Sequence, residues 1–400
     1  KNQVKEVTLG SILQKRPQNG FSPVCPTEPT GKWVLGLAAL DENGLNLAGA
    51  KPAPIDEPLV DKFLLEEGDF LISRSNTLDK VGRVGVFKGG LANCSYPDLM
   101  MRFRPNTSLV SPDFLEACLR SDQTARYIQR HATGTSGSMK KINQAIVESI
   151  PVVLLPMAEQ MKVAKIHSSW DLAIRNSNAL VQKKLEYFCW LREHLIESEC
   201  NHSGFVRLDQ VASIPNKVPL TTIEDDFALT VKLHCKGIER NEKNRPKQTE
   251  NGRPYYRRAA GEFLVGRQNI HNGGFVVIPL ELDGGIASNA ITSVVTNSEK
   301  LSAEYLFYFF SRPKFYLQLE ALMGGTGQKE MSESELMKLK VALPSIERQQ
   351  KIVEILNAAG AEIDILQDLF KKYQLQKAAI MKKLLSGEWH APVPEDEVTA

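Results

Sequence analysis

The hydrophobic pattern marks two long stretches, 156–200 and 344–387, in which apolar residues recur every seven positions. Each stretch starts at a proline and contains no other proline, so neither carries an internal helix breaker of that kind. A heptad seam of this length is typical of coiled-coil helices rather than of the broad face of a globular helix. Gly360 is a candidate break in the second helix. The seam positions are Ile174, Val181, Phe188 and Leu195 in the first stretch, and Ile363, Phe370, Lys377 and Leu384 in the second.

The segments that precede the two stretches, 1–155 and 201–343, are divided by glycine and proline into short apolar runs. Runs such as Phe70–Ile72 have the length and the aromatic or β-branched content of strands. One helix is expected in each segment, near Pro112–Arg130 and near Ala303–Leu322. Strands and helices without regular βαβ spacing predict an α+β fold for each segment.

The chain also repeats itself at a spacing of about 190 residues, which is a signature of internal duplication. The stretch Gly68–Asn76, with the sequence GDFLISRSN, is matched by Gly261–Asn269, with the sequence GEFLVGRQN. Further matched landmarks follow in the same order, so we infer a tandem duplication. These are Ser111–Leu115 with Ser302–Leu306, the glycine loops Gly134–Gly137 and Gly324–Gly327, and the apolar runs Ile150–Pro156 and Leu339–Pro344.

The two helices are expected to pair with each other. A helix of about 40 residues is roughly 60 Å long, and a seam of that length needs a partner of similar length. Antiparallel pairing would hold the two globules at opposite ends, with pseudo-two-fold symmetry. The fold class predicted is therefore α+β, with two globular domains separated by two long antiparallel coiled-coil helices. The predicted boundaries are 1–155 and 201–343 for the globular domains, 156–200 and 344–387 for the helices, and 388–400 for a tail.

Composition limits the functional classes. Lys and Arg number 49 against 47 for Asp and Glu, and the net charge of +2 excludes a polycation held to nucleic acid by bulk charge, although a local basic surface remains open. No run of 18 apolar residues predicts a membrane helix, and Lys1–Gly10 lacks the apolar core of a secretory signal. Six scattered cysteines without a C-x-x-C pair are typical of reduced thiols, so we expect a cytoplasmic protein.

Catalytic motifs are absent from the sequence. The sequence lacks the phosphate-binding motif G-x-x-x-x-G-K-[ST] and a dinucleotide-binding G-x-G-x-x-G after a strand. It also lacks the Asn/Asp-Pro-Pro-Tyr tetrapeptide of amino-methyltransferases, the H-E-x-x-H motif of zinc proteases and the G-x-S-x-G motif of hydrolases. Cys189, His194, Cys200 and His202 are zinc-ligand types, but Cys189 and His194 lie five positions apart on a helix and face different sides. We therefore expect no metal site, no cofactor and no catalysis by this chain.

The remaining chemistry suits the binding of a polyanion. Arg240–Arg258 contains seven basic and two acidic residues with two interleaved tyrosines. Arg74 and Arg267 occupy equivalent places after their strands, each followed by x-Asn, and Arg and Asn are side chains that read guanine and adenine edges. The glycine loops could offer backbone N–H groups to phosphate. The candidate DNA-binding residues are Arg74, Asn76, Arg83, Lys88, Lys140, Lys141, Arg253, Tyr255, Tyr256, Arg257, Arg258, Arg267 and Asn269.

Each of these features also has a purely structural interpretation. The basic segment could be a solvated loop, and each glycine loop a plain turn into the next strand. The two equivalent arginines could form structural salt bridges with neighbouring carboxylates.

The order of these landmarks resembles the specificity subunits of type I restriction-modification systems. The resemblance rests on Ile150–Gln160 (IPVVLLPMAEQ) with its heptad helix, on a second copy that ends at Met381–Gly387 (MKKLLSG), and on the GDFLISR stretch. It covers nearly the whole chain. The second copy departs from the motif, because Leu343–Gln349 (LPSIERQ) has one extra residue and an arginine.

What the resemblance implies is a subunit that recognises DNA without acting on it. Each globule would be a target-recognition domain that reads one half of an asymmetric, bipartite sequence in double-stranded DNA. Two methyltransferase subunits would bind this chain and methylate adenine, and restriction/translocase subunits would join the complex. S-adenosylmethionine, ATP and Mg²⁺ would then belong to those partner subunits and not to this chain.

The helices are where partners are expected to dock, because they carry more apolar residues than one seam needs. We expect some of these to contact the methyltransferase subunits, and packing against the chain's own globules is the alternative. Two other functions stay open at this point: a specificity subunit of a type IIB-like system, and a coiled-coil scaffold whose globules bind protein. The candidate partner-binding residues are Trp170, Leu185, Trp190 and Leu191.

Overall fold

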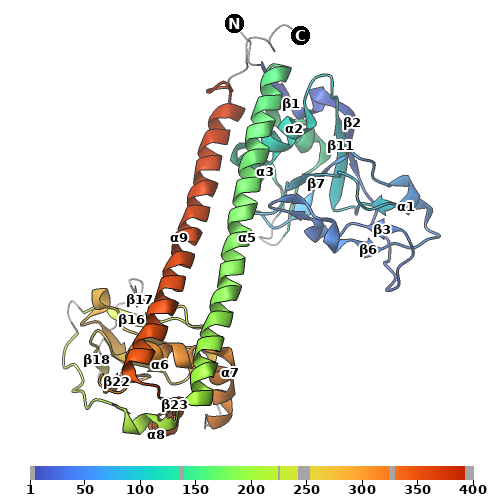
Figure 1. The fold of residues 1–400 in the computed structure, drawn as a ribbon. Helices are drawn as coiled ribbons and strands as arrows, with labels where there is room; N and C mark the ends of the chain where they lie inside the picture. The colour runs from blue at the N-terminus through green and yellow to red at the C-terminus, as the bar shows by residue number, and fades with distance from the viewer. Residues whose placement is uncertain (1–4, 135–138, 224–225, 242–252, 324–328, 392–400) are drawn as a thin grey trace. The chain divides into compact units, whose positions relative to one another are not determined.

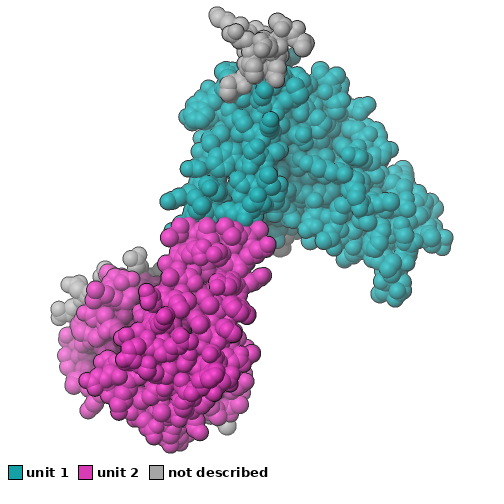
Figure 2. Space-filling view, viewed as in Figure 1, with its two compact units in different colours: residues 1–178, 368–400 teal, residues 179–367 magenta. Residues whose placement is uncertain are grey.

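A computed structural model describes residues 5–134, 139–223, 226–241, 253–323 and 329–391 of the chain (Figure 1). The chain divides into two compact units, which Figure 2 shows in two colours. Unit 1 comprises Lys1–Asn178 and Asp368–Ala400, and unit 2 comprises Ala179–Gln367. Both units mix strands with helices, so the expected α+β class is confirmed.

Two long helices, α5 (Met157–His202) and α9 (Ile346–Leu385), contain 46 and 40 residues. α5 directly follows Pro156, and Pro344 lies just before α9, consistent with the place of proline at helix starts. Gly387 follows α9 with φ of 71°, the left-handed conformation that ends many helices at glycine. The expectation of a break at Gly360 is wrong, because α9 continues through it and loses only the modest stability that glycine costs in a helix interior.

The two helices are antiparallel within each unit. In unit 1, Asp171 on α5 forms an ion pair with Lys377 on α9, and Glu159 near the start of α5 contacts His390 just beyond α9. In unit 2, Lys184 pairs with Glu362 at 2.7 Å, and Glu199 pairs with Arg348 at 2.7 Å. Residue numbers rise along α5 as they fall along α9, so the predicted antiparallel pairing is confirmed inside each unit.

Unit 1 is built on a four-stranded antiparallel sheet with the strand order β2-β11-β7-β9. Its strands are β2 (Leu13–Asn19), β11 (Met100–Pro105), β7 (Phe70–Ser73) and β9 (Val84–Val86). Smaller sheets pair β1 (Lys5–Thr8) with β13 (Pro151–Leu154), β12 (Lys140–Lys141) with β8 (Ser75–Asn76), and β4 (Leu40–Asp41) with β5 (Gly44–Leu45). A further sheet has the order β10 (Cys94–Ser95), β3 (Trp33–Val34), β6 (Lys51–Pro52).

Unit 2 repeats the main sheet of unit 1 in the order β15-β22-β19-β20. Its strands are β15 (Ala212–Ser213), β22 (Ile291–Thr296), β19 (Phe263–Gly266) and β20 (Phe275–Val277). β14 (Phe205–Arg207) pairs with β23 (Lys340–Ala342), as β1 pairs with β13. The tandem duplication read from the sequence is therefore confirmed in the topology. The units differ in their additional sheets, and the one in unit 2 has the order β17 (Ile238–Asn241), β16 (Ala228–Val231), β21 (Ile286–Ser288), β18 (Tyr255–Arg257).

The shorter helices other than α1 (Pro58–Lys62) pack against the core that contains the main sheet of their unit, whereas α1 packs through Val60 against Val34 and Ala53. The helix expected near Pro112–Arg130 is two helices, because the first ends at Leu119 and the Oγ atom of Ser121 accepts a hydrogen bond from the Thr124 N–H at the start of the second. The helix expected near Ala303–Leu322 is likewise divided, at Pro313. The short helices are α1 (Pro58–Lys62), α2 (Pro112–Leu119), α3 (Asp122–His131) and α4 (Gln144–Glu148) in unit 1, and α6 (Ala303–Phe310), α7 (Pro313–Tyr316) and α8 (Glu333–Lys338) in unit 2. Short 3-10 turns lie at Leu9–Ile12, Leu37–Ala39, Leu47–Gly49, Leu208–Gln210, Ile270–Asn272, Leu280–Leu282 and Leu317–Leu322.

A buried glutamine fastens each globule to its long helix. Gln160 on α5 accepts a hydrogen bond from the Ser111 N–H at 2.8 Å and donates to the Leu155 carbonyl at 2.8 Å. Gln349 on α9 accepts from the Ser302 N–H at 2.9 Å and donates to the Pro344 carbonyl at 2.9 Å. Both side chains are almost fully buried, so the last residue of the repeated Leu-Pro motif serves to hold α2 and α6 in place.

Candidate nucleic-acid interface

The structure brings several of the predicted DNA-binding residues of unit 1 together. Arg74 lies between β7 and β8, and β8 pairs with β12 so that Asn76 faces Lys140 and Ser75 faces Lys141. Arg83 joins them, because its carbonyl accepts a hydrogen bond from the Ser73 N–H at the end of β7. We call this group the basic edge and define it as Arg74, Asn76, Arg83, Lys140 and Lys141.

The cations of the basic edge lack ion-pair partners within 4 Å in the part of the chain that the structure describes. Arg74 donates to the carbonyl oxygen of Asp98 at 3.4 Å, and Lys140 donates to the carbonyl oxygen of Gly134 at 2.6 Å. A carbonyl accepts a hydrogen bond without neutralising the charge. The basic edge is therefore a local concentration of positive charge on a chain that is nearly neutral overall.

Unsatisfied polar atoms lie at the same edge. The Oγ atoms of Ser73 and Ser75 and the Nε atom of Arg74 are buried, and none of them has a hydrogen-bond partner among the residues described. Native proteins satisfy most buried polar atoms, so three unsatisfied atoms in consecutive residues need an explanation. The Nε atom of Arg267, at the equivalent place of unit 2, is unsatisfied in the same way, so this is a feature that the two strand ends share.

The equivalent edge of unit 2 is neutralised. Arg267 occupies the place of Arg74, but its Nη2 forms an ion pair with Glu330 at 2.7 Å and donates to the Asn289 carbonyl at 3.1 Å. Glu330 stands where unit 1 has Lys141, since the backbone bond from Met331 to Arg267 repeats the one from Ile142 to Arg74. The salt-bridge interpretation therefore describes Arg267 and does not describe Arg74.

The charges that flank Arg267 are also engaged within unit 2. Lys329, in the place of Lys140, pairs with Glu320 at 3.0 Å. Asn269 is exposed and starts a 3-10 turn through its backbone.

The other basic candidates of unit 2 lie on and around β18. Arg253 is exposed, and Tyr255 and Tyr256 are half-buried on the strand. Arg257 forms an ion pair with Asp226 at 2.7 Å and leaves more than half of its side chain exposed. The stretch 242–252, which supplies the rest of the predicted basic segment, lies outside the described residues, as do 135–138 and 324–328 of the two glycine loops.

Two predicted DNA-binding residues, Arg258 and Lys88, make their contacts with other residues of the protein. Arg258 is 5% exposed, and its Nη2 donates to the carbonyl oxygens of Ile291 at 2.6 Å and Ser288 at 3.4 Å. Its guanidinium therefore holds neighbouring segments of unit 2 from inside. Lys88 follows β9 and pairs with Glu116 on α2 at 3.4 Å, away from the basic edge. Neither partner could be foreseen from the local sequence.

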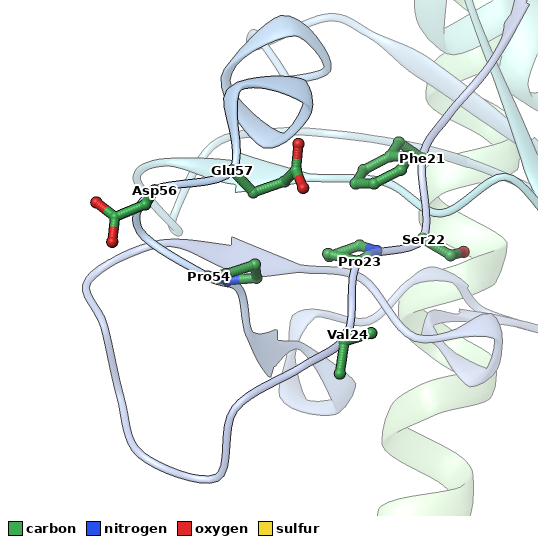
Figure 3. Close-up of a pocket in the computed structure, with 7 residues that line it drawn as sticks. All are labelled: Phe21, Ser22, Pro23, Val24, Pro54, Asp56 and Glu57. Atoms are coloured by element: carbon green, nitrogen blue, oxygen red, sulfur yellow. The ribbon is translucent and has the colours of Figure 1, made fainter.

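A separate cavity of about 440 Å³ lies near α1 in unit 1 (Figure 3). Figure 3 shows Glu57 and Phe21 pointing toward each other across it, while Asp56 points away. Glu57 is already engaged, because its carboxylate accepts a hydrogen bond from the Leu59 N–H and caps α1. The cavity has acidic and apolar walls and no basic residue in its lining, so its chemistry does not suit a phosphate group.

The predicted partner-binding residues on α5 fall into two groups. Trp170 is half-buried and packs edge-on against Tyr373 of α9, with ring centroids 6.0 Å apart, and Leu191 packs on the core of unit 2. Leu185 is half-buried. Trp190, in contrast, is 55% exposed and stacks on His194, with ring centroids 5.0 Å apart.

Sequence reasoning missed the neighbour on the other side of Trp190. Tyr187 stacks on Trp190 with ring centroids 5.7 Å apart and is itself 50% exposed. We call Tyr187, Trp190 and His194 the aromatic patch. Their spacing of three and four residues places them on one face of a helix, and this spacing was the signal in the sequence.

Within the described residues, no group of three or more His, Cys, Asp or Glu side chains is placed to hold a metal ion. The described helices include none that is both long and apolar enough to span a membrane. The six cysteines are free thiols, and burial raises the pKa of Cys94 to about 12.

Comparisons with known proteins identify relatives of the chain. The family model for the type I restriction modification DNA specificity domain matches residues 240–373. The chain is 24% identical over 362 residues to a putative type I restriction enzyme MjaX specificity subunit of Methanocaldococcus jannaschii, with 82% of this chain and 80% of that protein covered. It is 26% identical over 159 residues to the EcoEI specificity subunit of Escherichia coli, with 39% of this chain and 27% of that protein covered.

Solved structures share the fold along nearly the whole chain. The S subunit of a type I restriction-modification system from M. genitalium matches with a TM-score of 0.56 and 12% identity, over 96% of both chains. A chain from a structure on complex assembly and conformational transition of the type I R-M system matches with a TM-score of 0.58 and 13% identity, over 96% of this chain and 98% of that one.

Proposed function

We propose that this chain is a specificity subunit of a type I restriction-modification system and that each of its two globules reads one half of a bipartite DNA sequence. The observation that carries the proposal is the basic edge. It groups four cations that lack carboxylate partners among the residues described, and it places the carboxamide of Asn76 beside them. A DNA duplex offers phosphates to the cations and base edges to the guanidinium and the carboxamide.

Different side chains of the basic edge would have different tasks. Lys140 and Lys141 would contact phosphates, which position a protein on the duplex and make its binding depend on salt. Arg74 and Asn76 would contact base edges, since a guanidinium suits guanine and a carboxamide suits adenine.

The second globule would read its half of the sequence through other residues. Its edge at Arg267 is neutralised by Glu330, whereas Arg253, Tyr255 and Tyr256 lie at or near the surface around β18. Arginine beside aromatic rings suits phosphate and base contacts. Because the two globules present different chemistry, their half-sites should differ, and the target as a whole should be asymmetric.

We propose the aromatic patch as a docking point for a methyltransferase subunit. Interfaces are anchored by tryptophan and tyrosine more often than by other residues, and the patch exposes one of each on α5. Trp170 and Leu191 support this assignment less well, because they are packed inside their own units. Leu185 stays a candidate.

As a specificity subunit, the chain would assemble with two methyltransferase subunits and with restriction/translocase subunits. These partners would carry out the chemistry, together with S-adenosylmethionine, ATP and Mg²⁺. The chain would act in the cytoplasm and would contribute sequence selection without catalysis.

A map of DNA methylation would test the proposal. The chain is expressed with its cognate methyltransferase in a host without adenine methylation, and N6-methyladenine is located by long-read sequencing with and without the chain. We expect a split, asymmetric motif that appears only when the chain is present. An Arg74→Gln/Lys141→Gln variant should change or weaken one half of that motif and leave the other half intact. Methylation that is unchanged by the chain, in a complex shown to assemble, would contradict the proposal and favour a protein-binding scaffold.

A further inference from the structure

Equivalent positions of the two long helices can be matched through the glutamines that fasten the globules. Gln160 and Gln349 make the same pair of hydrogen bonds and lie 189 residues apart. The same interval relates Asp171 to Gly360 and Phe188 to Lys377. If the duplication were perfect, each of these pairs would hold the same residue, yet an acid corresponds to a glycine and an aromatic ring to a cation.

In unit 1, the contact between these positions is ionic. Asp171 Oδ1 lies 2.5 Å from Lys377 Nζ across the seam, and each of the two side chains is less than one fifth exposed. Arg120 contacts the other carboxylate oxygen of Asp171 at 3.5 Å, and His167 lies 3.4 Å from that same oxygen. Lys377, which interrupts the apolar heptad, is therefore matched by an acid at the same level of the seam.

In unit 2, the same contact is apolar. A Cβ atom placed on Gly360 would lie 4.0 Å from the ring carbon Cε2 of Phe188, so the ring lies over the glycine of the opposite helix. The ring also meets Tyr308 of its own globule edge-on, with centroids 6.4 Å apart. A small residue faces a large one here, and no charge is involved.

We propose that this mismatch between two equivalent layers makes α5 pair with α9 and not with a second copy of itself. Each helix carries one residue of the ionic layer and one residue of the apolar layer, 17 positions apart: Asp171 and Phe188 on α5, and Gly360 and Lys377 on α9. The favoured partner of each repeat is therefore the other repeat of this protein.

The two homotypic pairings fail for the same electrostatic reason. If two copies of α5 paired antiparallel in the register of the α5–α9 pair, each Asp171 would face a Phe188. If two copies of α9 paired in this way, each Lys377 would face a Gly360. Both arrangements leave a charge at the seam without a partner, which is strongly unfavourable where water is excluded. Single polar residues in otherwise apolar seams select partners by this mechanism.

The ionic layer and the apolar layer would let a duplicated chain keep its two different halves paired with each other. Duplication starts from two identical helices, for which self-pairing and cross-pairing are equally good. Asp171 and Lys377 are positioning residues in this view, because they act on partner choice and not on a ligand. The test below uses no DNA, so its failure would leave the proposed reading of DNA untouched.

The test makes α5 complementary to itself. In full-length Phe188→Lys/Lys377→Phe, two copies of α5 would face each other through two Asp–Lys layers and two copies of α9 through two Gly–Phe layers. The α5–α9 pair would instead leave Asp171 and the introduced ammonium group without charged partners. Two differently tagged copies are expressed together and purified through one tag, and the particle mass is measured by light scattering. We expect on the order of tenfold more mixed-tag complex than with the wild-type chain, because even a single unpaired buried charge shifts an equilibrium by at least that factor.

Two control variants separate pairing choice from loss of packing. Phe188→Ala removes the ring contacts without adding a charge, and Phe188→Glu adds a charge that two copies of α5 would set against Asp171. Both are expected to show the wild-type level of mixed-tag complex. If Phe188→Lys/Lys377→Phe shows no increase, or if either control increases as much as that variant does, the proposed selection is overturned.

Discussion

A buried carboxylate in each repeat holds the main sheet together, and it accounts for the acidic position in the duplicated Gly-Asp/Glu stretch. Asp69 is fully buried and accepts hydrogen bonds from Nε and Nη2 of Arg104 on β11, at 3.1 and 2.8 Å. Glu262 accepts a hydrogen bond from the Ser293 hydroxyl on β22 at 2.6 Å and pairs with Lys217. The partners differ, but in both repeats the acid contacts the equivalent neighbouring strand, so this part of the motif is structural.

Asp69→Ala should therefore destabilise unit 1. The substitution removes the buried acceptor of the Arg104 guanidinium and of the Glu66 N–H, and it leaves Arg104 with the exposed Glu66 carboxylate at 3.0 Å. This costs about 2 kcal/mol of unfolding free energy. Chemical denaturation followed by circular dichroism measures the change. Glu67→Ala, an exposed neighbour, is the control. Equal midpoints for the two variants would contradict the structural role.

The two equivalent arginines should respond differently to the same substitution. Arg74→Gln should weaken binding to DNA that carries the methylated motif by about 1–3 kcal/mol, because a free guanidinium is lost from the basic edge. Arg267→Gln should have a smaller effect, since Glu330 already occupies that guanidinium. Fluorescence anisotropy at several salt concentrations measures both. Equal losses would show that the Arg267–Glu330 pair opens on DNA and that the two edges are used alike.

At the scale of elements, a cluster of ionisable groups links α5, α9 and the loop after α2 in unit 1. Burial, followed by the positive charge of Lys377, lowers the pKa of His167 to about 4, while Asp171 acts in the opposite direction. For Asp171, burial favours a higher pKa, but the hydrogen bond from Lys377 and the positive charges of Lys377 and Arg120 outweigh it and lower the pKa. The folded state thus holds His167 neutral beside an ionised Asp171. Arg120 and Lys88 are the other charged groups that face this histidine.

This cluster predicts a loss of stability in mild acid. The unfolded chain protonates His167 below a pH of about 6.5, whereas the folded chain does so only near 4. The free energy of unfolding should therefore fall as the pH drops from 6.5 towards 4, by up to about 1.4 kcal/mol per pH unit.

Replacing the histidine isolates its share of this change in unfolding free energy with pH. His167→Leu copies Leu356, the fully buried residue at the equivalent position of α9, and should make the unfolding free energy depend less on pH. Thermal unfolding at a series of pH values measures it, with His202→Leu at the exposed end of α5 as the control. A slope unchanged by His167→Leu would assign the acid sensitivity to other groups.

At the scale of the whole molecule, the aromatic patch is expected to decide whether the chain assembles with its partner. Trp190→Asp replaces an exposed ring by a charge and should reduce co-purification of the methyltransferase at least about tenfold, as loss of a central anchor does. Leu280→Asp makes the same change at another exposed apolar residue of unit 2, outside the two long helices, and should have no effect. Full assembly with Trp190→Asp would exclude the patch as the docking point.

Much of the architecture was predictable because it depends on local patterns. Heptad spacing indicated α5 and α9, and the matched GDFLISR and GEFLVGR stretches indicated the repeated main sheet. The candidate site was predictable in part. The residues of the basic edge were identified, but Arg258 and Lys88 were grouped with them. The sequence does not show that Arg258 is buried or that Lys88 has an acidic partner.

Other features depend on residues that are far apart in the chain. The pairing of Lys377 with Asp171 joins positions 206 residues apart, and the pair of Arg267 with Glu330 spans 63. No periodicity reports such contacts, because they form only when separate elements pack together.

The sequence by itself determined the duplication, the long helices, the α+β class and the kinds of residue available to meet a polyanion. All of these follow from the period of apolar residues and from local side-chain chemistry. The tertiary structure alone decided which charges are free and which are neutralised: Arg74 faces a carbonyl, Arg267 faces a carboxylate, and Lys377 is matched across the seam. The physical reason is that the energy of a charge depends on what surrounds it in space, and those surroundings are built from residues distant in the sequence.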